Sequence, residues 1–134
     1  MTKRQKLFLA LTALWLCVIW GHSMMPATDS GNESNFLAKW LMQYIPWMND
    51  YVIRKVAHFA EYAVLGGLLL GAFPQRGRAA ILHAVLAGVL VALTDETIQL
   101  FAPGRSGQIT DVWLDLAGFC SGQLLLRLAS RKKE

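Results

Sequence analysis

The sequence has few charged residues and few cysteines. Charged side chains make up 16% of the 134 residues, whereas hydrophobic ones make up 54%. A soluble domain averages about 25% charged residues, so this composition argues against a soluble globular protein. Cys17 and Cys120 both lie in apolar segments and form no C-x-x-C spacing. We therefore expect neither a disulfide framework nor a cysteine metal site.

Common catalytic and nucleotide-binding motifs are missing as well. The chain contains no P-loop, no dinucleotide-binding glycine motif and no Ser-His-Asp arrangement. It has three histidines, and His22 and His83 belong to other regions than His58. A phosphatase mechanism that pairs a phosphohistidine with a second histidine therefore lacks a residue. These absences exclude the most easily recognised enzyme classes.

Four long apolar segments are present, at residues 7–25, 52–73, 79–101 and 109–126. Each is close to the ~20 residues that cross the ~30 Å hydrocarbon core of a bilayer. Together they fill most of the chain, so we expect residues 1–134 to form one integral membrane domain. Short connections favour antiparallel neighbours. The predicted fold is all-α, a polytopic membrane protein with four transmembrane helices in an antiparallel bundle.

A fifth, shorter helix is predicted at about residues 35–45, in the first outer loop. Its large apolar side chains recur with helical spacing, but the segment is too short to cross a bilayer. Two interpretations stay open. The helix lies in the membrane interface, or it packs over the mouth of the bundle.

Basic residues are concentrated at one set of segment ends, which accounts for the net charge of +4 without a nucleic-acid partner. By the positive-inside rule this pattern predicts a multi-pass protein in contact with the lipid bilayer, with both termini in the cytoplasm. The basic residues at these ends are Lys3, Arg4, Lys6, Arg76, Arg78, Arg127, Arg131, Lys132 and Lys133.

Ionisable side chains also lie inside the apolar segments, where a charge is costly and usually marks function. These residues are His58, Glu61, Asp95, Glu96, Asp111 and Asp115. With the predicted topology, His58, Asp95 and Asp115 each lie six residues in from the outer end of a segment. At 1.5 Å per residue they share one depth, about 9 Å below the outer surface. Three segments thus bring charges to one layer.

Helical periodicity places these residues on inward faces. Arg54, His58 and Glu61 share one face, and Asp95 shares another with Gln99. A Gly-rich turn then carries Arg105 over the same mouth, where a guanidinium suits an anion. The candidate acid–base residues are His58, Glu61, Asp95 and Glu96. The candidate substrate-binding residues are Arg54, Gln99, Arg105, Asp111 and Asp115. A divalent metal, if the protein uses one, would be bound by His58, Asp95 and Asp115.

Three ordered motifs resemble the VanZ-like family of membrane proteins. They are Arg54-Lys55-x-x-His58-x-x-Glu61-Tyr62, then Asp95-Glu96-x-x-Gln99-x-Phe101-x-Pro103-Gly104-Arg105, and then Asp111-Val112-x-x-Asp115-x-x-Gly118. The family is named after a protein associated with resistance to the glycopeptide teicoplanin. The resemblance implies a small protein of the bacterial cytoplasmic membrane that influences glycopeptide susceptibility.

Three functional hypotheses follow. In the first, an extracytoplasmic polar pocket recognises an anionic lipid-linked envelope molecule or a phospholipid head group, and an enzyme would also modify it through His58 or Glu61. In the second, the protein binds or translocates an amphiphile without catalysis, with the acids as a proton relay. In the third, the charges form a structural salt-bridge network. The sequence specifies neither the substrate nor the oligomeric state.

Overall fold

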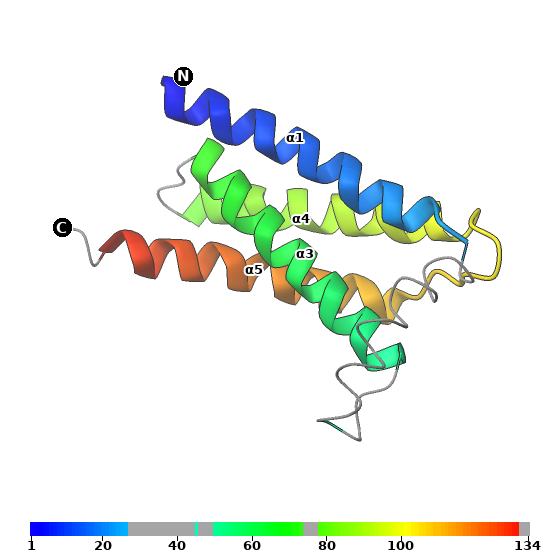
Figure 1. The fold of residues 1–134 in the computed structure, drawn as a ribbon. Coiled ribbons are helices and arrows are strands. Elements are labelled where there is room, and N and C mark those ends of the chain that lie inside the picture. Colours follow the sequence, from blue (N-terminus) through cyan, green and yellow to red (C-terminus); the bar gives the residue numbers. More distant parts are fainter. Residues whose placement is uncertain (27–44, 46–49, 74–77, 132–134) are drawn as a thin grey trace.

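The protein is a bundle of long helices in the computed structural model (Figure 1). The structure describes residues 1–26, 45, 50–73 and 78–131. Its helices are α1 (Lys3–Met24), α3 (Asp50–Ala72), α4 (Arg78–Gln99) and α5 (Ile109–Arg131). The predicted all-α fold is confirmed. The helix predicted at residues 35–45 lies, apart from Ile45, outside the described residues.

The helices form a ring in which α3 packs most extensively against α5. Helix α1 lies against α3 and α4, and α4 completes the ring against α5. Both chain termini lie at one end of the bundle, and the α4–α5 loop lies at the other (Figure 1). Although a short connection joins α3 to α4, their main contacts are with other helices. The helices α3 and α4 run antiparallel, as predicted, but they pack mainly against other helices and not against each other.

Close packing of α3 on α5 depends on glycines. A Cβ atom on Gly66 would overlap the backbone carbonyl of Phe119, and one on Gly122 would overlap that of Ala63. Small residues let membrane helices approach backbone to backbone in this way. The contact sets the distance between the two helices, and so the spacing of the polar side chains nearer the loop end.

The outer surface of the bundle is apolar, as expected for a protein surrounded by lipid. The central core is small, with Ile19, Tyr62, Leu65 and Phe119 almost wholly buried. Many leucines are exposed along the outside, among them Leu7, Leu14, Leu82, Leu86, Leu90, Leu93, Leu124, Leu125 and Leu128. A soluble protein rarely exposes such a continuous apolar surface, so this pattern indicates contact with the bilayer.

Three of the helices are long and apolar enough to cross a membrane: Lys3–Met24, Ala79–Gln99 and Ile109–Ser130. Helix α3 is as long as the others but is not among these candidates. Its first half carries Arg54, Lys55, His58 and Glu61, which lower its hydropathy. That α3 also crosses the membrane stays a prediction, and it would need its neighbours to shield these groups from lipid.

Candidate functional site

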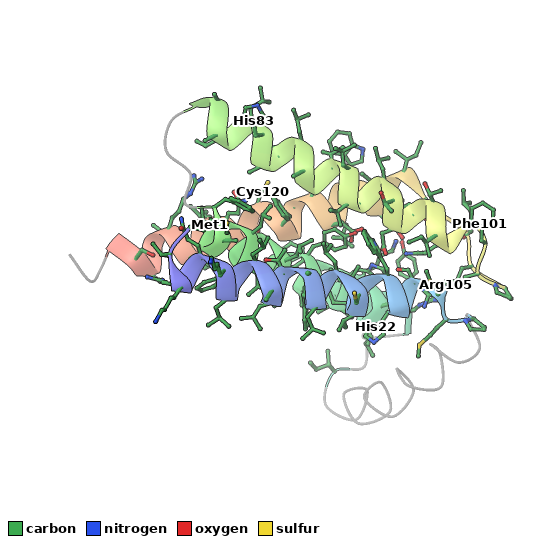
Figure 2. The ribbon with its side chains drawn as sticks, turned by 90° about the horizontal axis from the view of Figure 1, so that it is seen from above. Met1, His22, His83, Phe101, Arg105 and Cys120 are labelled. Atoms are coloured by element: carbon green, nitrogen blue, oxygen red, sulfur yellow. The ribbon has the colours of Figure 1, made fainter. Side chains whose placement is uncertain are left out.

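A polar pocket opens at the loop end of the bundle, opposite the chain termini. Figure 2 shows Arg105 and Met1 at opposite ends of the molecule. The pocket is lined by the first turns of α3, the end of α4, the α4–α5 loop and the start of α5. It encloses about 180 Å³. Drug-sized ligands occupy roughly 300–1,000 Å³, so this space suits a small ion or head group rather than a whole lipid.

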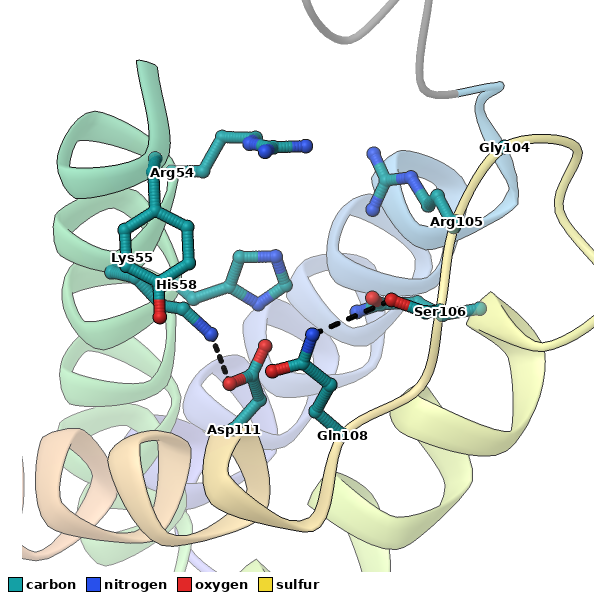
Figure 3. Close-up of a pocket in the computed structure, with 10 residues that line it drawn as sticks. Arg54, Lys55, His58, Gly104, Arg105, Ser106, Gln108 and Asp111 are labelled. Carbon is teal, nitrogen blue, oxygen red and sulfur yellow. Dashed lines mark hydrogen bonds and ion pairs between the residues drawn. The ribbon is translucent and has the colours of Figure 1, made fainter. Parts of the chain in front are cut away.

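Two guanidinium groups face each other across the pocket. Figure 3 shows Arg54, from α3, and Arg105, from the α4–α5 loop, pointing toward one another. Within the part of the chain that the structure describes, neither one forms an ion pair. The Nε atom of Arg105 is also buried, with no hydrogen-bond partner among the described residues. Burial lowers the pKa of the Arg105 guanidinium, and the nearby positive charge of Arg54 lowers that pKa further.

A tight turn holds Arg105 in this position. The backbone N–H of Arg105 donates to the carbonyl of Ala102 at 3.1 Å. Pro103 occupies the second position of this turn, and Gly104 has a positive φ of 74°. Proline followed by a residue with positive φ is the signature of a type II turn, which favours glycine at that third position. The Pro-Gly pair therefore directs the Arg105 side chain back over the pocket.

Glu96 anchors the second half of the same loop. Its Oε2 atom accepts a hydrogen bond from the backbone N–H of Gln108 at 2.6 Å. Gly107 lies so close to α4 that an added Cβ would be 2.6 Å from the carbonyl oxygen of Glu96. Glu96 thus fixes the loop to the end of α4. The acid–base role suggested for Glu96 by the sequence stays a prediction.

A third positive group on the pocket wall, Lys55, is paired with an acid. The ammonium group of Lys55 forms an ion pair with Asp111, the acid nearest the rim (Figure 3). Lys55 also lies over the Tyr51 ring, 5.1 Å from its centroid. Asp111 is therefore occupied by Lys55 and does not neutralise Arg54 or Arg105.

Below the pocket lies a buried cluster of His58, Asp95 and Asp115. The Nδ1 atom of His58 is 3.7 Å from Oδ1 of Asp115 and 3.9 Å from Oδ2 of Asp95. Both carboxylates are 0% exposed, and the His58 side chain is 21% exposed. One ligand atom from each residue lies within 4.8 Å of the others. The structure thus brings together the three residues that the sequence predicted at one depth.

The two acids of the cluster differ in their hydrogen bonds. Asp95 accepts hydrogen bonds from the Ser23 hydroxyl at 2.5 Å and from the Gln99 amide at 3.3 Å. Among the described residues, neither oxygen of Asp115 has a hydrogen-bond partner. The hydroxyl of Tyr62 is buried and unpartnered too. A buried polar group without a partner is costly, so this part of the cluster is poised for a ligand.

Glu61 lies apart from this cluster. Its Oε1 atom is 2.7 Å from Nδ1 of His22 in α1, and its backbone carbonyl accepts a hydrogen bond from the Trp15 indole at 2.9 Å. These contacts connect α1 to α3 beside the site. His83 lies at the other end of the molecule, as expected (Figure 2).

Sequence reasoning missed three contributions to the site. Ser23 and His22 come from α1, and neither was assigned a partner. Ser23 lies two residues from the outer end of its apolar segment and Asp95 lies six from the end of its own, so the depth argument did not pair them. Tyr62 follows His58 by four residues and so lies on the same helical face. The pairing of Lys55 with Asp111 had no signal in the sequence, because it depends on how α3 and α5 are juxtaposed.

The chemistry of the cluster fits a divalent cation. Two carboxylates and an imidazole are ligand types that Zn²⁺ and Mn²⁺ accept. Asp95 is oriented by Ser23 and Gln99, as metal-binding carboxylates commonly are by neighbouring donors. The same three residues were the candidate ligands in the sequence.

Fold and site together define a multi-pass helical membrane protein with a buried His/Asp cluster. The profile of the VanZ/LLP1 family matches residues 8–130, so the chain belongs to this family. The resemblance seen in the three motifs is thereby confirmed and extends into α1. No curated protein and no solved structure matches the chain.

Proposed function

We propose that this protein recognises the anionic head group of a lipid-linked cell-envelope molecule in its polar pocket. The observation that carries the proposal is that Arg54 and Arg105 face each other across the pocket and form no ion pair with any described residue (Figure 3). Two like charges held in this way repel each other. An anion between them would remove the repulsion and would satisfy the buried Nε atom of Arg105.

The size and place of the pocket support an amphiphile as the ligand. A volume of about 180 Å³ accommodates a phosphate-sized head group. The pocket opens at the end of a bundle whose outer surface is apolar, so a lipid tail can lie along the helices while its head group enters. The loop residues Gly104, Ser106 and Gln108 line the same space.

The location is part of this proposal. Lys3 and Arg127 lie at the end of the bundle opposite the pocket, where the positive-inside rule expects the cytoplasm. We therefore propose that the pocket faces the extracytoplasmic side of a bacterial cytoplasmic membrane. An influence on glycopeptide susceptibility rests on the family resemblance alone. Comparing susceptibility in cells that carry wild-type protein or Arg105→Lys tests it, and equal susceptibility with equal protein levels contradicts it.

The binding experiment compares polyprenyl phosphate with uncharged polyprenol, added to the EDTA-treated protein in detergent. Thermal stabilisation of the protein by each lipid is the readout. Arg105→Lys keeps the charge but removes the planar fork that binds phosphate through two hydrogen bonds. Loss of a charge-assisted hydrogen bond costs about 1.5–3 kcal/mol, so the affinity for polyprenyl phosphate should fall roughly tenfold to hundredfold.

Arg4→Lys is the matched control, because Arg4 lies in the first turn of α1 at the opposite end and contacts Phe8. It should bind polyprenyl phosphate as tightly as wild-type protein. Equal stabilisation by polyprenol and polyprenyl phosphate, or an unchanged affinity in Arg105→Lys, contradicts the proposal.

An acid–base role for His58 is a second candidate. His58 lines the pocket and also faces the two buried acids, so it connects the ligand space to the cluster. In an enzyme, His58→Gln would abolish turnover of the bound lipid while binding survives. Full turnover by a correctly folded His58→Gln protein excludes acid–base catalysis by this residue.

A further inference from the structure

We propose that His58, Asp95 and Asp115 bind a first-row divalent metal ion, of the Mn²⁺ or Zn²⁺ type, beneath the pocket. This proposal goes beyond anion recognition and does not depend on it. It rests on the distances within the cluster, on its charge and on the unpartnered oxygens of Asp115.

The distances are those that a shared cation imposes. Zn–N and Zn–O bonds are about 2.0–2.2 Å, so two ligands lie about 3.4 Å apart at a tetrahedral angle and at most about 4.4 Å apart. The Nδ1 atom of His58 is 3.7 Å from Asp115 and 3.9 Å from Asp95, inside this range. Direct hydrogen bonds would be near 2.9 Å. His58 therefore lies too far from either acid for a hydrogen bond, and at a separation from each that suits two ligands of one ion.

The charge of the cluster also favours a divalent ion. When both are ionised, Asp95 and Asp115 place two negative charges at positions that are 0% exposed. The hydrogen-bond donors on Asp95, Ser23 and Gln99, are neutral. A protonated His58 would balance only one of the two charges, whereas a divalent cation with neutral His58 balances both. Buried charges are stable in proteins when they are paired or coordinate metals.

Asp115 provides the independent observation. It is fully buried, and neither carboxylate oxygen has a hydrogen-bond partner among the described residues. A protonated Asp115 would be expected to donate a hydrogen bond, and an ionised one to accept several. Nδ1 of His58, on the other side of the gap, is likewise buried and unpartnered. These two groups lie 3.7 Å apart, with no hydrogen bond between them.

An ion can reach this position through the pocket. His58 lines the pocket with one part of its side chain and faces the acids with Nδ1. Three protein ligands leave at least one coordination position free, as in catalytic zinc sites. That position is where water, or an oxygen of a ligand held by the two arginines, would bind. Calcium is a poor match, because it takes six to eight oxygen ligands.

The test measures metal binding without any lipid or phosphate, so its result does not depend on the proposed function. Purified full-length protein in detergent is stripped with EDTA, dialysed and titrated with Mn²⁺, with the free ion followed by its EPR signal; Zn²⁺ binding is measured in competition. We expect one ion per chain. Asp115→Asn and His58→Gln should each weaken binding at least tenfold, because each removes one of three ligands.

The control is Asp111→Asn, the same substitution on the same helix four residues earlier. It removes an equal charge that is paired with Lys55 and lies outside the cluster, so Mn²⁺ affinity should change less than threefold. Thermal melting shows that each variant is folded. Without metal, Asp115→Asn should melt at or above the wild-type temperature, because it replaces a buried carboxylate that accepts no hydrogen bond from any described residue. Metal should stabilise wild-type protein and Asp111→Asn but not Asp115→Asn.

The proposal is overturned if the wild-type protein binds neither Mn²⁺ nor Zn²⁺, or if it binds them as tightly after both ligand substitutions. It is also overturned if Asp115→Asn melts well below the wild type in EDTA, because Asp115 would then be satisfied within the protein itself.

Discussion

The packing of α3 on α5 makes a prediction that two adjacent glycines can test. A Cβ atom on Gly66 would overlap the backbone carbonyl of Phe119. A Cβ atom on Gly67 would lie 3.8 Å from the carbonyl oxygen of Gly122, an ordinary contact distance. Gly66→Ala and Gly67→Ala are the same change in the same helix. They share the gain in helix propensity of up to about 1 kcal/mol, which cancels in their difference.

The difference that remains is the cost of the overlap. A backbone carbonyl cannot rotate away as a side chain can, so α3 and α5 must separate. Forcing an extra methyl group into a well-packed contact costs typically 1–3 kcal/mol. Gly66→Ala should therefore be less stable than Gly67→Ala by about 1–3 kcal/mol. Because α3 carries His58 and α5 carries Asp115, the separation should also weaken Mn²⁺ binding in Gly66→Ala and not in Gly67→Ala.

Reversible unfolding in mixed detergent and SDS micelles, followed by tryptophan fluorescence, measures this difference. The chain has five tryptophans, so the signal is strong. Equal unfolding midpoints for the two variants would refute the backbone contact between α3 and α5. A lower midpoint for Gly67→Ala than for Gly66→Ala would mean that α5 packs against the face of α3 that carries Gly67 and not the face that carries Gly66.

Two further predictions concern the cluster and the topology. Ser23→Ala should destabilise the protein by about 1.5–3 kcal/mol in the same unfolding assay, because it removes a hydrogen bond to the buried carboxylate of Asp95. The control is Ser121→Ala, which should change stability by less than about 0.5 kcal/mol because the exposed Ser121 hydroxyl bonds back to its own helix. Equal effects of the two substitutions would contradict the role of Ser23. In a cysteine-free background, a thiol at Ser106 should react with a membrane-impermeant reagent on intact cells and one at Gln75 should not; the reverse pattern would place the pocket in the cytoplasm.

The sequence was most informative where a residue's position depends on its own helix. Counting residues inward from the ends of the apolar segments placed His58, Asp95 and Asp115 at one depth, and helical periodicity turned Asp95 and Gln99 to the same side. The structure brings these residues together. The Pro103-Gly104 turn was equally readable, because its chemistry is local.

The sequence was least informative about pairs that belong to different helices. The contact of His22 with Glu61, and that of Ser23 with Asp95, depend on α1 lying against α3 and α4. Periodicity within one helix shows which face is polar but not which neighbour meets it. The contact of Glu96 with the loop was not predicted for a related reason. Its carboxylate binds the backbone N–H of Gln108, and backbone partners leave no trace in the pattern of side chains.

The measurement that tests the central claim most directly is an experimental structure of the protein in lipid nanodiscs with polyprenyl phosphate. Our account predicts density for the phosphate between the guanidiniums of Arg54 and Arg105, with the lipid tail along the outside of the bundle. A structure in which both arginines form ion pairs with acids of the protein, and the phosphate lies elsewhere, would contradict it.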